Sequence, residues 1–99
     1  MKGADFNKEI LNKRILPNEN IVSWRVIDNQ IIFFHKKERS FYELNKTGSF
    51  IWKKLNDKAQ TKNIVDLISS NYDVDRDTAE KDTLEFIKDL LKKKIFIAR

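Results

Sequence analysis

The chain has 99 residues, of which 40% are hydrophobic and 35% charged, and its formal charge is +5 with no cysteine. This length fits one small domain and leaves little apolar material for a deep substrate cavity. The absence of cysteine excludes a disulfide framework, a thiolate nucleophile and cysteine-based metal sites, and we expect a cytoplasmic protein. The positive charge would suit an acidic partner, whether nucleic acid, an anionic lipid surface or an acidic peptide.

The first residues contain no apolar run of signal-peptide length, so we expect neither secretion nor a membrane span. Residues 1–16 have loosely spaced apolar side chains and end at Pro17, which disfavours helix at the residue before it. We interpret residues 1–16 as an N-terminal arm and residues 17–99 as the folded domain.

Three short strands are predicted next, over Ile21–Ile27, Ile31–His35 and Ser40–Leu44, because β-branched and aromatic residues dominate between two polar breaks. The connections are only a few residues long, so neighbouring strands run antiparallel. In the third strand Tyr42 and Leu44 share one face, which we expect to be the core face. Phe41 and Glu43 share the other.

Three helices follow, because the apolar period changes to that of a helix after residue 44. They are predicted over about 46–55, from Thr61 to Tyr72, and over about 76–93, with Asn45 and Asp75 as caps and Thr61 as the start signal. Gly48 inside the first helix indicates a close approach by a neighbouring element. On the second helix Ile64, Val65, Leu67 and Ile68 form the expected apolar side.

The chain has few groups for catalysis. His35 is the only imidazole, at the end of a predicted strand and without a partner at a suitable spacing. Asp73, Asp75 and Asp77 resemble the start of a calcium loop, but Thr78 and Leu84 stand where that loop needs Gly and Glu. Helix capping explains these aspartates better. We therefore expect a binding protein without catalytic residues, metal or cofactor.

Two kinds of partner remain open on the residues alone. A positively charged domain of strands and helices could be a winged-helix nucleic-acid-binding protein. However, the last helix carries five acidic residues beside six basic ones, and these carboxylates would repel the phosphates of DNA. Alternatively, the third strand is a sheet edge that pairs with an extended peptide, unless the charges around it only protect that edge. A dimer formed through residues 1–16 is a weaker alternative.

The spacing of residues from the third strand onward resembles that of the PqqD-like family of peptide-recognition domains, which serve pathways of ribosomally made, modified peptides. The matching residues are Phe41 to Trp52, Ile64 to Ile68, Tyr72 to Asp75, and Asp82 with Phe86, Ile87, Leu90 and Leu91. The glycine usual after the first helix is absent, since residues 56–59 read Asn-Asp-Lys-Ala. This resemblance implies an α+β, winged helix-turn-helix-like fold, with a three-stranded antiparallel sheet followed by three helices and no enzymatic activity.

The resemblance also implies a partner and a site. The partner would be the leader segment of a precursor peptide, added as a strand on the third strand and presented to a modifying enzyme, either a radical SAM maturase or a lasso-type leader peptidase. No membrane partner is expected. The implied peptide-binding residues are Arg39, Ser40, Phe41, Tyr42, Glu43 and Leu44 on the strand and Lys81, Asp82, Glu85, Phe86 and Asp89 on the last helix.

Overall fold

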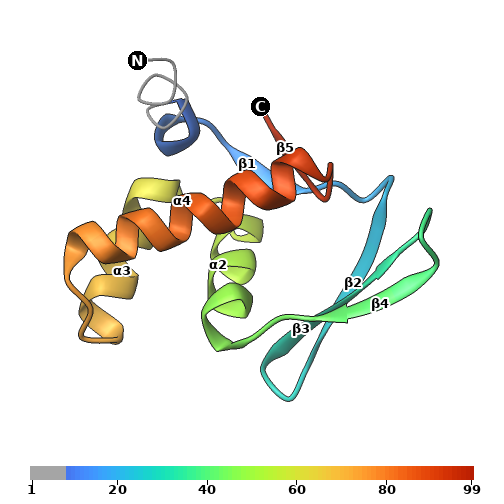
Figure 1. The fold of residues 1–99 in the computed structure, drawn as a ribbon, viewed down its shortest axis with the longest axis horizontal. Helices are drawn as coiled ribbons and strands as arrows, with labels where there is room; N and C mark the ends of the chain where they lie inside the picture. Colours follow the sequence, from blue (N-terminus) through green and yellow to red (C-terminus); the bar gives the residue numbers. More distant parts are fainter. Residues whose placement is uncertain (1–8) are drawn as a thin grey trace.

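The computed structural model describes residues 9–99, in which an antiparallel sheet is followed by helices (Figure 1). A short helical stretch at residues 9–12 precedes the first strand. The elements are β1 Ile15–Pro17, β2 Val22–Ile27, β3 Gln30–His35, β4 Ser40–Glu43, α2 Lys46–Asn56, α3 Thr61–Asn71, α4 Arg76–Lys92 and β5 Phe96–Ala98. The predicted α+β class, with a three-stranded sheet before the helices, is confirmed.

The main sheet has the order β2-β3-β4, so that β3 is central and β2 and β4 are its edges. Asp28 and Asn29 join β2 to β3 with φ angles of 50° and 67°, as a two-residue hairpin of the I′ type requires. Arg39 closes the second hairpin with a φ of 58°, and its N–H donates to the His35 carbonyl at 2.7 Å. Both turns lie where the polar breaks in the sequence predicted them.

Two of the three helix starts agree with the predicted caps. The Asn45 side chain accepts the Gly48 N–H at 2.8 Å, and the Asp75 carboxylate accepts the Thr78 N–H at 3.2 Å. The start of α3 differs by one position. Gln60 occupies the N-cap position without a side-chain bond, and Thr61, which we expected there, is the first helical residue and is fully buried.

The segment around Pro17 pairs with the end of the chain. β1 runs antiparallel to β5, with Pro17 opposite Phe96. Ile10 and Ile15 are only 2% and 0% exposed, so this segment contributes to the core. This pair forms a separate two-stranded sheet and does not extend the three-stranded one. Among residues 9–99, no strand pairs with the outer edge of β4.

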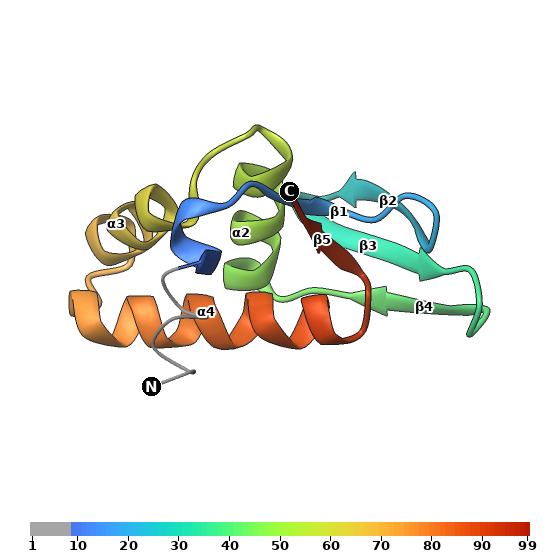
Figure 2. The same cartoon turned by 90° about the horizontal axis from the view of Figure 1, so that it is seen from above.

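Helix α2 forms the centre of the core, between the three-stranded sheet and α3, while α4 runs along one side of the molecule (Figure 2). Trp52 of α2 is fully buried, and its ring lies 5.1 Å from the rings of both Phe33 and Phe96. Replacing such a side chain with alanine costs ~3–5 kcal/mol, so Trp52 anchors the sheet to β5.

One predicted core position is wrong. Leu67, expected on the apolar side of α3, is 37% exposed, because the buried stripe of that helix runs through Ile64, Val65 and Ile68. Within residues 9–99, no helix is both long enough and apolar enough to cross a bilayer.

Candidate functional site: the edge of β4 and the groove beside α4

The outer edge of β4 has a defined hydrogen-bonding phase. Leu44, directly after β4, donates its backbone N–H to the Ile31 carbonyl at 2.9 Å. Bonded and non-bonded pairs alternate along an antiparallel ladder, so the backbone groups of Tyr42 also point toward β3. The N–H and C=O groups of Phe41 and Glu43 then point away from the sheet, where another extended chain could pair with them.

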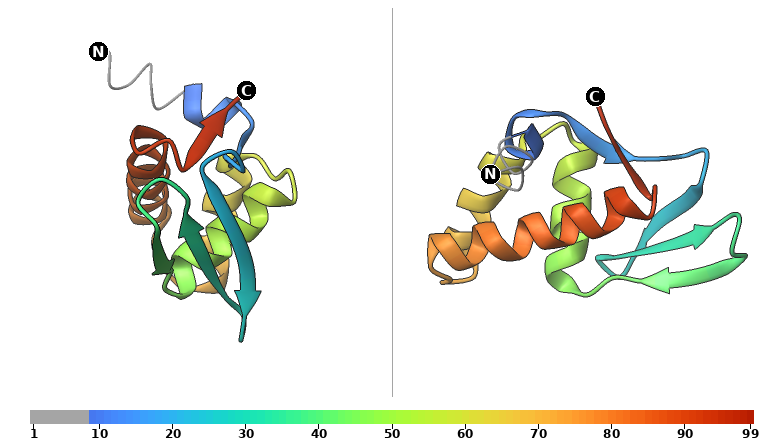
Figure 3. Two further views of the ribbon diagram at one scale, coloured as in Figure 1. Left: turned by 90° about the vertical axis from the view of Figure 1, so that its right-hand side faces the viewer. Right: turned by 45° about the horizontal axis from the view of Figure 1, so that its top comes forward.

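A groove of about 250 Å³ lies between this edge and the C-terminal half of α4. In Figure 3 (left), α4 lies beside β4, and β2 forms the far edge of the sheet. Three of its apolar residues are buried, whereas its charged residues are exposed. It is lined by Phe33, Glu38, Tyr42, Glu43, Leu44, Phe86, Asp89, Leu90, Lys93 and Ile95.

A stack of three aromatic rings supports the strand side of the groove. Tyr42 stacks on Phe33 with ring centroids 5.1 Å apart, and Phe33 stacks on buried Trp52 at the same distance. Tyr42 therefore faces the core side of the sheet, as strand alternation predicted, yet it remains 42% exposed because it lies on the edge strand. Its ring forms one side of the groove and is held by the core behind it.

The helix side of the groove depends on Gly48 of α2. A Cβ at this position would lie 3.1 Å from Cε1 of Phe86 and 3.2 Å from Oδ1 of Asn45. The close approach that Gly48 indicated in the sequence is confirmed, and the neighbour is Phe86 of α4. Glycine lets α4 lie close to α2 and places the Phe86 ring in the groove.

Two polar contacts fix charged groups at the groove. The Tyr42 hydroxyl donates a short hydrogen bond to Oε1 of Glu38, and this bond to the carboxylate raises the pKa of Tyr42. Across the groove, the Lys93 ammonium pairs with the Asp89 carboxylate at 3.2 Å, one turn apart on α4.

His35 has a structural role in the hairpin beside the groove. It is buried, and its Nδ1 accepts the backbone N–H of Glu38 at 3.1 Å. This bond holds the turn that positions Glu38 next to Tyr42. In the described part of the chain, no three His, Asp or Glu side chains are arranged to hold a metal ion.

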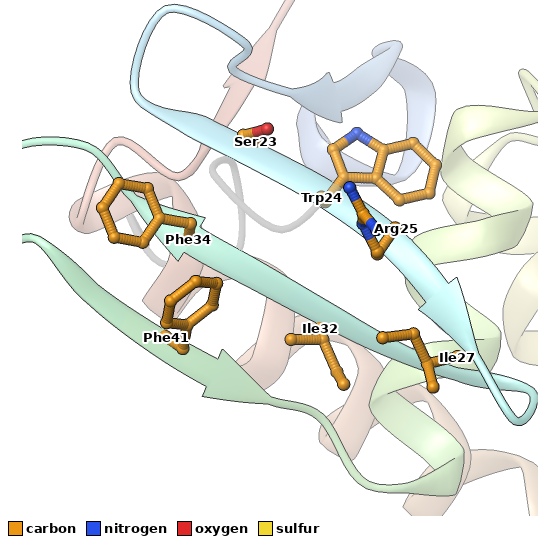
Figure 4. Close-up of a pocket in the computed structure, with 7 residues that line it drawn as sticks. All are labelled: Ser23, Trp24, Arg25, Ile27, Ile32, Phe34 and Phe41. Carbon is orange, nitrogen blue, oxygen red and sulfur yellow. The ribbon is translucent and has the colours of Figure 1, made fainter.

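The opposite face of the sheet carries a separate apolar hollow of about 490 Å³ (Figure 4). Phe41 lies here, 74% exposed, with its ring 4.9 Å from that of Phe34. Ile27 and Ile32 continue this surface along β2 and β3. A strand paired with β4 would turn alternate side chains toward the groove and toward this face.

The structure brings together only part of the predicted site. Arg39 lies in the hairpin and Ser40 begins β4 opposite His35, while Lys81 and Glu85 line a different hollow on the exposed side of α4. Asp82 is exposed one turn before Phe86, beyond the residues that line the groove. The predicted residues that meet in the groove are Tyr42, Glu43, Leu44, Phe86 and Asp89.

Five groove residues were missed: Phe33, Glu38, Leu90, Lys93 and Ile95. Leu90 and Lys93 follow Phe86 and Asp89 at helical spacing, so extending that stripe toward the C-terminus would have found them. Lys81 and Glu85 fall outside it, since they lie roughly 100–140° around the helix from Phe86. Glu38 gave no signal, because its place depends on how the hairpin folds.

Comparisons with known proteins agree with this geometry. The family model of coenzyme PQQ synthesis protein D, PqqD, matches residues 30–95, which include β3, β4 and all of α2, α3 and α4. A solved structure of TbiB1 in complex with the TbiA(beta) leader peptide is 30% identical, with a TM-score of 0.73, over 82% of this chain and 93% of that one.

A second solved structure, lasso peptide synthetase B1 complexed with the leader peptide, has a TM-score of 0.76 at 19% identity, over 85% of this chain and 98% of that one. At this identity it supports the fold alone. No curated protein sequence gave a significant match. The family model covers more than half of the chain, through the edge strand and both sides of the groove. The chain therefore belongs to the PqqD family.

Proposed function

We propose that this protein binds the leader segment of a ribosomally made precursor peptide as an added strand on β4, without catalysing a reaction itself. The observation that carries the proposal is the open edge of β4 beside the groove. Phe41 and Glu43 offer backbone donors and acceptors, and Phe86, Leu90 and Ile95 offer apolar contact within reach of the same strand. Backbone pairing supplies affinity in this mode, and the groove supplies selectivity.

The relatives support the same partner class. The 30% identical structure is described as a complex with a leader peptide, and the family model covers the strand and helix that border the groove. An extended peptide held here would raise the local concentration of its attached core peptide at an enzyme bound to either partner. The enzyme served is a radical SAM maturase or a leader peptidase of the lasso type.

The nucleic-acid alternative is not favoured by the arrangement of charge. The exposed side of α4 carries Asp77, Glu80 and Glu85 beside Lys81 and Lys88. The three carboxylates would repel phosphates, whose neutralisation by basic residues supplies most of the affinity for DNA. A titration with duplex DNA at two salt concentrations tests this point, because a DNA-binding protein would show steep salt dependence.

The test of strand addition compares two substitutions of one residue. Peptides are first selected from a randomised phage-displayed library on the immobilised protein, then synthesised, and their affinities are measured by fluorescence anisotropy. Glu43→Pro removes an outward N–H without removing a bond to β3, whereas Glu43→Ala keeps that N–H. We expect Glu43→Pro to bind the selected peptides about two- to tenfold more weakly than Glu43→Ala, the range for one hydrogen bond.

Circular dichroism and thermal unfolding establish that both variants are folded. Equal affinities in two folded variants would overturn pairing at this edge. A wild-type protein that enriches no peptide from the library would overturn peptide binding itself.

A further inference from the structure

The charge of the groove differs in sign from the charge of the chain. Two carboxylates face it, from Glu38 and Asp89, against the single ammonium of Lys93. Glu43 borders the groove from the edge strand, but its side chain lies on the same face of β4 as Phe41. The remaining lining residues are Phe33, Tyr42, Leu44, Phe86, Leu90 and Ile95, which are uncharged. The protein as a whole has a formal charge of +5. The net charge therefore does not describe what a peptide meets in the groove.

The two carboxylates are not both compensated. Lys93 pairs with Asp89, and Glu38 accepts a bond from the neutral Tyr42 hydroxyl. Glu38 forms no ion pair with any residue in 9–99, and its bond to Tyr42 holds the carboxylate beside the strand on which a peptide would pair.

Several basic side chains interact with other parts of the protein. The Lys36 ammonium donates to the Glu19 carbonyl, Lys53 donates to Asn29, and Lys54 lies over the ring of Phe50. Lys37 and Arg39 flank Glu38 in the hairpin, but neither forms an ion pair with its carboxylate within residues 9–99.

We propose, on the basis of the function above, that the bound peptide carries a lysine or arginine next to a large apolar residue on the same face of its strand. The apolar side chain would contact Phe86 and Leu90, and the cation would lie near Glu38. Residues on one face of a strand alternate, so the two are separated by one residue. The motif is an apolar residue, any residue, then lysine or arginine, or its reverse.

Two properties of binding follow. The cation adds affinity through partly exposed ion pairs, so replacing it in the peptide with glutamine should weaken binding by about fivefold. That loss should shrink as salt is raised, because exposed ion pairs are screened. The apolar contact should depend little on salt over the same range.

The test uses a randomised phage-displayed peptide library with three forms of the protein. The wild type is compared with the variant Glu38→Gln and with Asp73→Asn. Asp73 is the matched control for loss of a carboxylate, because it is exposed and lies before the N-terminus of α4, at the other end of the helix from the groove. Its φ is positive, a conformation that asparagine also tolerates. Selected peptides are sequenced, and their affinities are measured at low and high salt.

We expect the wild type and Asp73→Asn to enrich lysine or arginine two positions from a large apolar residue. Glu38→Gln should keep the apolar residue and lose the enrichment of the cation. Peptides that bind the wild type and weaken with Glu43→Pro, but show no preference for lysine or arginine, would overturn this inference and leave strand addition standing. Enriched peptides that bind Glu43→Pro and Glu43→Ala equally would overturn the proposed function and this inference with it.

Discussion

The backbone N–H of Leu44 donates to the carbonyl of Ile31 across 2.9 Å, and this bond fixes the phase of β4. In that phase the outward backbone groups belong to Phe41 and Glu43, and the Tyr42 ring lies on the groove side. A shift of one residue would exchange both sets. The peptide-binding properties proposed for this protein therefore depend on how firmly the end of β4 is held.

Ser49 of α2 holds the end of β4 in place. Its buried hydroxyl accepts the Ile31 N–H at 2.9 Å and donates to the Leu44 carbonyl at 3.3 Å. Ser49→Ala would leave a buried N–H unpaired, so we expect a loss of ~1–3 kcal/mol in the free energy of unfolding, measured by urea denaturation. The exposed Ser70 on α3 is the control, and Ser70→Ala should change stability by less than about 0.5 kcal/mol. Equal stabilities would contradict this role for Ser49.

Neighbouring residues of α4 should contribute unequally to peptide binding. Phe86 lines the groove, whereas Glu85 lines the hollow on the other side of the helix. Phe86→Ala should weaken binding of a selected peptide about tenfold through lost apolar contact, and Glu85→Ala should leave the affinity nearly unchanged. Isothermal titration calorimetry measures both. If Glu85→Ala proved the more damaging change, the peptide would lie on the other side of α4.

Gly48→Ala should affect binding more than stability. The added methyl would improve helix propensity by up to ~1 kcal/mol, but it would approach Phe86 to 3.1 Å and displace its half-buried ring. We expect a small change in melting temperature and a loss of peptide affinity. The ring is the cause if Gly48→Ala loses no further affinity in a Phe86→Leu background. An equal loss in both backgrounds would show that the effect arises elsewhere.

Asp75 gives α4 a dependence on acidity. Hydrogen bonds from the Thr78 hydroxyl and N–H lower the pKa of Asp75 below its ordinary value of 3.8. Because the pKa of Asp75 is lower in the folded protein, the capping carboxylate stabilises the folded state fully when the pH is above the ordinary pKa. This stabilisation is lost as the pH falls through the pKa of the folded protein. Asp75→Ala should melt several degrees lower than wild type at neutral pH, whereas Asp75→Asn keeps a capping oxygen and should melt close to wild type.

Melting curves across pH check this point. The difference in melting temperature between wild type and Asp75→Ala should disappear in acid. The difference between Asp75→Asn and Asp75→Ala should persist. A difference between wild type and Asp75→Ala that does not change with pH would contradict the capping role of the charged form.

Local signals predicted most of the fold. Two polar breaks located the hairpins, and the side chains of Asn45 and Asp75 marked helix starts, because each acts within a few residues of itself. The pairing of β1 with β5 joins opposite ends of the chain through three-residue strands, which are too short to show a period. The sequence therefore identified residues 1–16 only as an arm, although Ile10 and Ile15 are buried in the core.

The candidate site was predicted less completely than the fold. The strand side followed from alternation and an open edge, but the helix side depends on which stripe of α4 faces β4. That orientation follows from Phe86 packing beside Gly48, a tertiary contact that placed Asp89 in the groove and Glu85 outside it. Net charge says little about the groove, since the chain carries +5 while Glu38 and Asp89 face the groove beside the single Lys93.

Residue-resolved amide hydrogen exchange, with and without a selected peptide, tests strand addition on β4 most directly. In the free protein the amides of Phe41 and Glu43 should exchange fast, and those of Tyr42 and Leu44 slowly, since only the latter two point toward β3. Bound peptide should slow Phe41 and Glu43 strongly and change Tyr42 and Leu44 little. A saturating peptide that leaves the exchange of Phe41 and Glu43 unchanged would contradict the account.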